Sequence, residues 1–87
     1  MNANPSFEKL RAELAAAIKH ARSVTGISQE QLALTAEVDR TYVSQIERQV
    51  ANPSLQVLAR LADTLDAEIK ITFQLRERPA LRLATDT

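Results

Sequence analysis

Residues 27–48, ISQEQLALTAEVDRTYVSQIER, decide the fold of this chain. Ser28 and Gln31 have the spacing of a capping box, in which each side chain satisfies a free backbone N–H of the other residue, and this arrangement begins a helix. Asp39 is a favourable N-cap for another helix, and it follows a break in the apolar pattern. We therefore expect two short helices joined by a tight turn, the second of them over residues 39–48.

The two short helices are expected to cross closely. Ala33 supplies a small side chain at the crossing, and four apolar residues are spaced to hold the helices at a fixed angle. These four are Leu32, Val38, Val43 and Ile46. Such a pair projects the outer face of its second helix, and a DNA major groove about 12 Å wide accepts a helix. The pattern therefore indicates a DNA-binding surface.

A longer helix is expected before this pair, over about residues 7–24. Its apolar residues recur every three or four positions, which is the period of a helix with one buried face. They are Phe7, Leu10, Leu14, Ile18 and Ala21. Pro5 suits the first turn and Asn4 or Ser6 would cap it. Gly26, the only glycine, would end the helix in the left-handed conformation.

A fourth helix is expected after a turn formed by Asn52, Pro53 and Ser54, because Ser54 is a good N-cap. Its apolar face consists of Leu55, Leu58, Leu61, Ala62 and Leu65. These spacings are again those of a helix with one buried side, so the chain is predicted to contain four main helices.

After Asp66 the apolar period changes to that of a strand. The apolar residues of this alternation are Ile69, Ile71, Phe73 and Leu75, and the polar ones are Glu68, Lys70, Thr72, Gln74 and Arg76. A lone strand leaves its backbone donors and acceptors unpaired. We therefore expect the apolar residues to form a dimer contact, in which the strand pairs antiparallel with that of a second copy. The stripe of Phe7, Leu10 and Leu14 is expected to pack against this ribbon.

Composition limits the class of protein. A chain of 87 residues has room for one domain with a modest core, and 45% apolar with 25% charged residues is close to the globular average. There is no cysteine, and no run approaches the roughly 20 apolar residues of a membrane span, so a cytoplasmic protein is expected. Eleven basic and eleven acidic side chains cancel, which predicts weak non-specific DNA binding and leaves specificity to individual residues.

Enzymatic function is not expected. His20 is the only histidine, and the sequence has no nucleophile and base pair, no phosphate-binding loop and no metal-ligand cluster. We accordingly expect no cofactor and no metal, and interpret His20 as a surface residue.

Three segments in order resemble the phage-repressor and Cro family of helix-turn-helix proteins, also called the xenobiotic-response-element (XRE) family. They are residues 27–33 (ISQEQLA), 42–48 (YVSQIER) and 52–55 (NPSL), within a resemblance that covers about residues 17–65. It implies an all-α, lambda-repressor-like bundle of four main helices, to which this chain adds one C-terminal β-strand that pairs across a dimer. The expected division is a helix-turn-helix domain with an extended first helix (1–66), a dimerisation strand (67–76) and a loose tail (77–87).

The resemblance also implies roles for residues on the DNA-facing surface. Arg40, Thr41 and Gln45 fall where the family faces base edges, and their chemistry suits guanine, the thymine methyl group and adenine respectively. Gln29 would open the second helix against the DNA backbone or a base, with Ser28 capping that helix. The positions that would touch or lie near the phosphate backbone are Tyr42, Ser44, Arg48 and Asn52.

Arg22 and Glu47 occupy the positions of a structural ion pair in the family, which would tie the first helix to the DNA-facing helix. Two residues depart from the family pattern. Glu37 stands where the turn usually has glycine, and Gln49 where the DNA-facing helix usually ends in one. A non-glycine residue in the left-handed conformation costs on the order of 1 kcal/mol. We therefore expect a slightly altered turn and an intact motif.

These features predict a transcription regulator, with repression the favoured sign, that binds a palindromic operator in double-stranded DNA as a homodimer and so joins the nucleoid. One alternative is an antitoxin of the HipB type, which would bind its operator and a toxin kinase. A controller protein of a restriction-modification system is a further alternative. The neutral charge favours a third, a protein-interaction module that keeps the fold without binding DNA.

Overall fold

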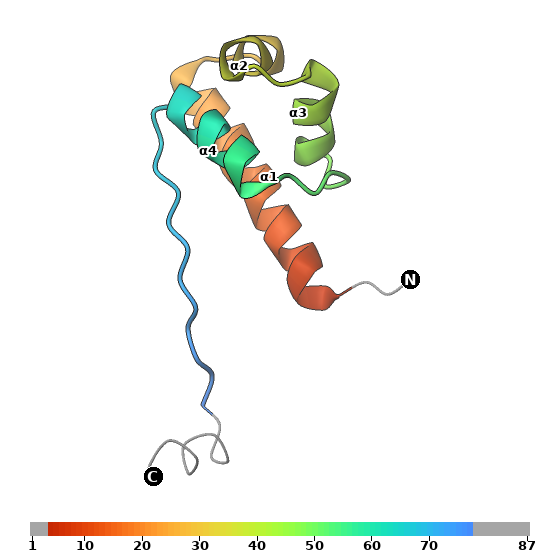
Figure 1. The fold of residues 1–87 in the computed structure, drawn as a ribbon, viewed down its shortest axis with the longest axis vertical. Helices are drawn as coiled ribbons and strands as arrows, with labels where there is room; N and C mark the ends of the chain where they lie inside the picture. Colours follow the sequence, from red (N-terminus) through yellow and green to blue (C-terminus); the bar gives the residue numbers. More distant parts are fainter. Residues whose placement is uncertain (1–3, 78–87) are drawn as a thin grey trace.

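The computed structural model describes residues 4–77, and four helices make up its body (Figure 1). They are α1 (Pro5–Thr25), α2 (Gln29–Ala36), α3 (Arg40–Glu47) and α4 (Leu55–Thr64). The short helices α2 and α3 lie across one end and one side of the long α1, and α4 packs on α2 (Figure 1). The predicted all-α arrangement of four main helices is confirmed in the described residues.

Each helix begins at a side chain that accepts hydrogen bonds from its first turn. Asn4, one of the two caps expected for α1, accepts from the backbone N–H of Ser6 at 2.8 Å. Ser28 and Gln31 form the expected capping box, and the caps of α3 and α4 are Asp39 and Ser54. These bonds satisfy N–H groups that have no partner inside a helix, so each helix starts where its sequence signal predicts.

Left-handed residues end the helices and turn the chain. Gly26 ends α1 at φ 74°. Glu37 and Gln49, the two positions where the family has glycine, adopt the same region at φ 61° and 66°, and so does Asp66 at φ 56°. The motif is intact, as expected, because α2 and α3 lie on either side of Glu37. Glu37 and Gln49 both adopt the left-handed conformation that glycine favours, so the altered turn stays a prediction.

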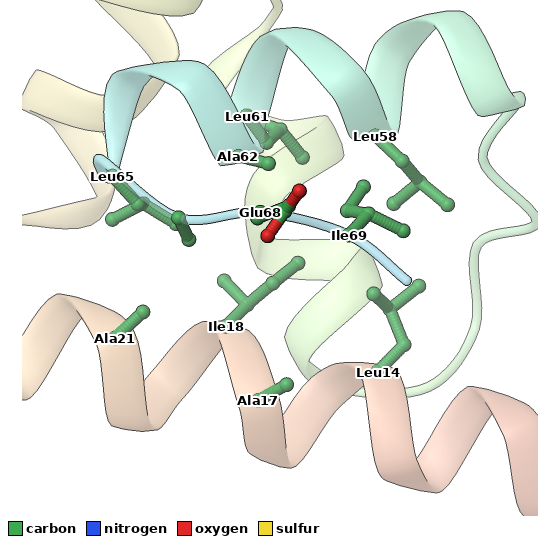
Figure 2. A pocket seen from close by; sticks show the side chains of 11 residues that line it. Leu14, Ala17, Ile18, Ala21, Leu58, Leu61, Ala62, Leu65, Glu68 and Ile69 are labelled. Carbon is green, nitrogen blue, oxygen red and sulfur yellow. The ribbon is translucent and has the colours of Figure 1, made fainter. Parts of the chain in front are cut away.

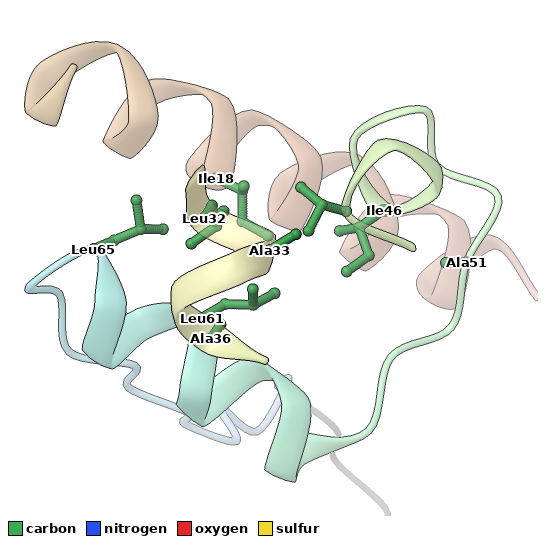
Figure 3. Close-up of a cluster of buried hydrophobic side chains, with 9 residues drawn as sticks. Ile18, Leu32, Ala33, Ala36, Ile46, Ala51, Leu61 and Leu65 are labelled. Atoms are coloured by element: carbon green, nitrogen blue, oxygen red, sulfur yellow. The ribbon is translucent and has the colours of Figure 1, made fainter. Parts of the chain in front are cut away.

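The core lies between α2, α3 and α4 and reaches one side of α1 (Figure 3). Leu32 and Val43 are fully buried, and Ala33 is 2% exposed, as its predicted place at the helix crossing requires. Ile46 and Leu61 enter the same cluster from α3 and α4. Close packing of this kind fixes the angle between α2 and α3, since an interior of native density tolerates little change in side-chain volume.

The predicted C-terminal β-strand is not formed in the described residues. Residues 67–77 are extended but form no ladder, and after residue 69 they run away from the helices as a separate trace (Figure 1). The alternation of apolar and polar side chains predicted a strand, and this is wrong for the single chain. A strand needs a neighbour for its backbone hydrogen bonds, and the described part of the chain supplies none. The loose tail predicted for 77–87 lies, apart from Glu77, outside the described residues.

The N-terminal stripe of α1 packs only in part as expected. Leu14 reaches the start of the C-terminal segment, where it lines a hollow together with Ile69. Phe7 instead lies under the guanidinium of Arg11, which is 4.7 Å from the centroid of the ring, and Leu10 is exposed. The stripe and the C-terminal segment therefore meet at one end only.

Candidate nucleic-acid interface

The two sides of α3 have opposite character. Val43 and Ile46 point into the core, whereas Arg40 and Thr41 are exposed at the start of the helix. Residues three and four apart share one helix face, so Ser44 and Arg48 continue the line of the exposed residues and Gln45 lies beside them. Tyr42, Ser44 and Gln45 are half-buried, and Tyr42 packs against the core cluster. The structure thus gathers the predicted base-facing residues on one outward side.

The carboxylate of Glu47 fixes the C-terminal end of α3. Glu47 is 4% exposed, and Arg22 of α1 donates to it through two nitrogens, Nε to Oε2 at 2.6 Å and Nη2 to Oε1 at 2.9 Å. Nη1 of the same guanidinium donates to the carbonyl oxygen of Ile27 at 3.1 Å. The planar fork of arginine matches a carboxylate in this two-bond geometry. Arg22 and Glu47 therefore join α1, the following loop and α3.

Gln29, at the start of α2, is part of the same cluster. Its Nε2 donates to Oε1 of Glu47 at 2.9 Å, so one amide N–H that was predicted to face DNA is engaged inside the protein. The hydroxyl oxygen of Ser28 likewise accepts the N–H of Gln31 at 3.0 Å, which is its predicted capping role. Both residues therefore fix the start of α2, and Gln29 also ties it to the buried side of α3.

The pKa values of the ion pair reflect two opposed effects. Burial favours the neutral acid and by itself raises the pKa of Glu47, but hydrogen bonds from Arg22 and Gln29 and the positive charge of Arg22 more than offset this, and the pKa is lowered. For Arg22 the hydrogen bond to Glu47 raises the pKa, against a smaller opposing effect of burial. Both groups are therefore held in their charged forms.

Two long-range contacts of this scaffold have no signal in the sequence. One is the bond from Gln29 to Glu47, and the other joins Nε of Arg60 in α4 to the carbonyl oxygen of Ala36 at 3.1 Å. Arg60 places a cation at the C-terminal end of α2, whose last turn has no basic residue of its own, and the helix dipole favours that position. The partners are 18 and 24 residues apart, so no local pattern signals them.

The remaining predicted contact residues lie past the end of α3. Arg48 is the C-cap of α3, and both it and Asn52 are exposed. Between them the chain turns at Gln49 and returns to the core at Ala51. The surface formed by α3 and the ends next to it therefore carries arginines at both ends of the helix, at Arg40 and Arg48.

Within residues 4–77, no group of three or more histidine, cysteine, aspartate or glutamate side chains is placed to hold a metal ion. None of the four helices combines the length and the apolar character needed to cross a bilayer.

Comparison with known proteins identifies the family. Residues 25–70 match the family described as Helix-turn-helix. The control protein C.SmaI of Serratia marcescens is 32% identical over 68 residues, which are 78% of this chain and 81% of that protein. A hypothetical transcription factor of Neisseria meningitidis serogroup B is 38% identical over 79 residues, 91% of this chain and 72% of that protein. The chain belongs to the helix-turn-helix family.

A solved structure agrees with this assignment. The crystal structure of a point mutant of the restriction-modification controller protein C.Esp1396I matches with a TM-score of 0.65 at 32% identity, over 68% of this chain and 75% of that one. The chain is therefore a helix-turn-helix transcription regulator and no enzyme, as the sequence predicted. The HipB-type antitoxin alternative finds no support in these relatives, which include a control protein and a restriction-modification controller.

Proposed function

We propose that the chain regulates transcription by binding a palindromic operator as a homodimer, with α3 in the major groove. The observation that carries this proposal is the two-sided character of α3, in which Val43, Ile46 and Glu47 are buried and Arg40 and Thr41 are exposed. Because its inner side is buried, the helix cannot rotate, and its outer side chains keep a fixed orientation. Recognition of bases requires side chains that are fixed in this way.

The base-reading residues in this proposal are Arg40, Thr41 and Gln45. Arginine donates two hydrogen bonds to guanine O6 and N7, glutamine pairs with the N6 and N7 of adenine, and the threonine methyl group contacts that of thymine. Each good pair discriminates against a wrong base by about 1–3 kcal/mol. Gln45 is half-buried, so only part of its side chain is open to a base.

The remaining polar residues would position the protein on the phosphates. These are Ser28, Gln29, Tyr42, Ser44, Arg48 and Asn52. The N–H groups at the start of α2 add a partial positive charge there, which favours a phosphate. Contacts of this kind fix register and orientation without reading sequence. The chain has no net charge, whereas a basic protein attracts DNA through its whole surface. In this proposal, the electrostatic attraction to DNA therefore comes from these phosphate contacts.

Two copies are needed in this proposal because one short helix reads few base pairs. A symmetric dimer sets two α3 helices into successive major grooves about 34 Å apart, and the symmetry of the protein requires a palindromic or nearly palindromic site. Repression would follow where that site overlaps a promoter, because the bound dimer then blocks the polymerase.

A restriction-modification controller is the more specific form of this function. It is favoured by the two controller-type relatives, each 32% identical to this chain over more than two thirds of its length. If it is correct, DNA next to the gene of this chain contains the operator, and genes for a restriction enzyme and a methyltransferase lie beside it. If no fragment of the DNA next to the gene binds the protein in a gel shift, the assignment as a restriction-modification controller is contradicted.

Selection of bound sequences from random DNA tests the proposed function. The wild-type chain is expected to enrich a palindrome, and Arg40→Ala together with Gln45→Ala is expected to remove the sequence preference in a gel shift while leaving the circular dichroism spectrum unchanged. Lys9→Ala removes an exposed cation from the far end of α1 and serves as the control, with preference retained. An unchanged preference in the double variant would refute the assignment of α3.

The same selection separates DNA binding from a protein-interaction module. A module of that kind enriches no sequence at any salt concentration. A specific DNA binder enriches one, and its affinity falls as salt rises because phosphate contacts release counterions. Few cations face the proposed interface, so we expect a shallower salt dependence than that of a strongly basic regulator.

A further inference from the structure

The C-terminal segment, residues 67–77, leaves the helices with its apolar side chains uncovered. Ile69 is 44% exposed, Ile71 63%, Phe73 93% and Leu75 87%. No backbone group from residue 69 to residue 76 is hydrogen-bonded to another described residue. Side chains of this size and an open backbone ladder together indicate a surface that another extended chain covers.

An apolar hollow lies where this segment begins. It has a volume of about 120 Å³ and is lined by α1, by α4 and by residues 67–69. Figure 2 shows Leu14 and Ile18 pointing up from α1, Leu58 and Leu61 pointing down from α4, and Ile69 between the two helices. Ile69 therefore occupies one edge of the hollow, and the apolar side of the segment continues outward from it.

Two copies of the segment are complementary to each other when they are paired antiparallel. In an antiparallel pair, directly opposite residues lie on the same face. With a twofold axis at Thr72, Ile69 lies opposite Leu75 of the second copy and Ile71 opposite Phe73, so every apolar residue meets an apolar one. On the other face Glu68 lies opposite Arg76, twice in each dimer. Within residues 4–77 neither Glu68 nor Arg76 forms an ion pair, so both are available.

Neighbouring registers are less favourable. Moving the axis to Phe73 sets Lys70 opposite Arg76, and like charges in that position destabilise a strand pair. Moving it to Ile71 sets Arg76 opposite Asp66, whose φ of 56° takes it out of the extended conformation that a ladder requires. Moving it by half a step sets apolar residues opposite polar ones.

We propose that residues 68–76 pair antiparallel with the same segment of a second copy about a twofold axis at Thr72, with Glu68 of each copy opposite Arg76 of the other. Leu75 of each copy then lies beside Ile69 of the other copy. It covers the hollow between α1 and α4 of that other copy. This inference specifies the dimer of the proposed function and rests on it.

Single cysteines test the register directly, because the chain has no cysteine of its own. Opposite residues have Cβ atoms about 4.5–5.5 Å apart. Thr72→Cys is therefore expected to cross-link to itself on oxidation or with a short bismaleimide. Lys70→Cys and Gln74→Cys serve as controls, since the two copies of either residue are four positions out of register, or about 13 Å apart. Neither is expected to cross-link alone, whereas a mixture of the two is.

Charge reversal tests the ion pairs independently of cysteine chemistry. Glu68→Arg or Arg76→Glu is expected to raise the dimer dissociation constant at least about fivefold, because two unlike pairs become two like ones. The double variant is expected to restore the wild-type value. Lys70→Glu makes the same change of charge as Arg76→Glu, but opposite the neutral Gln74, and is expected to leave the dissociation constant within about twofold. Analytical ultracentrifugation measures all four.

The outcomes separate this inference from the proposed function. If the chain dimerises and enriches a palindrome but Thr72→Cys does not cross-link, or Lys70→Cys or Gln74→Cys cross-links alone, the register is wrong and the function stands. A wild-type chain that stays monomeric at micromolar concentration overturns both the register and the dimer. Self cross-linking at residue 72 together with rescue by the double charge reversal supports the proposal.

Discussion

The carboxylate of Glu47 is hydrogen-bonded to both of the helices that precede α3. It receives three hydrogen bonds, two from Arg22 and one from Gln29, and is almost fully removed from water. A buried pair of this kind contributes little compared with an apolar one of equal size, but the loss of one partner leaves the other charge uncompensated. The function of the pair is therefore positional, since it fixes α3 relative to α1 and α2.

Replacement of Glu47 by glutamine is accordingly expected to destabilise the protein by about 3 kcal/mol, because Arg22 then keeps a partly buried charge without a counterion. Urea unfolding followed by circular dichroism measures the change. Glu13→Gln removes an exposed carboxylate from α1 and is the matched control, with an effect within about 0.5 kcal/mol. A loss of less than about 1 kcal/mol in Glu47→Gln would show that the pair does not anchor α3.

The same residue gives the stability a pH dependence of known sign. The pKa of Glu47 is lower in the folded than in the unfolded chain, so its stabilising contribution is fully present above the ordinary glutamate pKa of about 4.3. It is lost as the pH falls from there toward the folded value. Unfolding free energies measured between pH 7 and pH 3 should therefore fall less steeply in Glu47→Gln than in the wild type. Equal slopes would contradict the lowered pKa.

Local sequence signals were sufficient to predict the helices, but they were insufficient to predict whether a strand forms. The expected helix over 7–24 is observed as α1 (Pro5–Thr25). Its signals are local, because the cap, Asn4, and the terminal glycine, Gly26, each stand directly next to the end of the helix that they fix. The alternation after Asp66 predicted a strand that the described residues do not form, because whether such a segment becomes a strand depends on a partner for its backbone. The bonds of Gln29 and Arg60 depend on contacts made only after folding, which is why no pattern revealed them.

The turns after α2 and α3 carry strain that substitution can relieve. Glu37 and Gln49 are non-glycine residues at φ 61° and 66°, and glycine adopts this region without a clash. Against this gain, glycine adds flexibility to the unfolded chain. We expect Glu37→Gly and Gln49→Gly each to stabilise the protein by about 0.5–1 kcal/mol in thermal unfolding.

A glycine placed in a regular helix provides the contrast. Glu13→Gly introduces the same residue at an exposed helical position of α1 and is expected to destabilise by about 1 kcal/mol. If Glu37→Gly and Gln49→Gly destabilise the chain as Glu13→Gly does, the left-handed conformation is not strained at these turns.

In the proposed function, the absence of net charge on the whole chain favours binding through two copies at once. One α3 helix with few phosphate contacts binds DNA weakly, and linking two of them raises the affinity because the second contact becomes intramolecular. In the proposed dimer this linkage runs through residues 68–76, a segment that contributes little to the helical core of its own chain beyond Ile69. Folding and operator binding are therefore separable by substitution in that segment.

Proline at both Ile71 and Thr72 is the substitution that separates them. Successive N–H groups of a strand point to opposite edges, so one of the two prolines must remove a bond to the second copy whichever way the ribbon faces. Both residues are exposed in the single chain, so its helices and melting temperature should be unchanged. Affinity for the full palindrome is expected to fall by about 10²–10⁴-fold, to that of a single half-site. The control, Ile71→Val with Thr72→Ser, keeps both N–H groups and should bind as the wild type does. If the proline variant still binds the palindrome with wild-type affinity, the copies are joined elsewhere on the molecule.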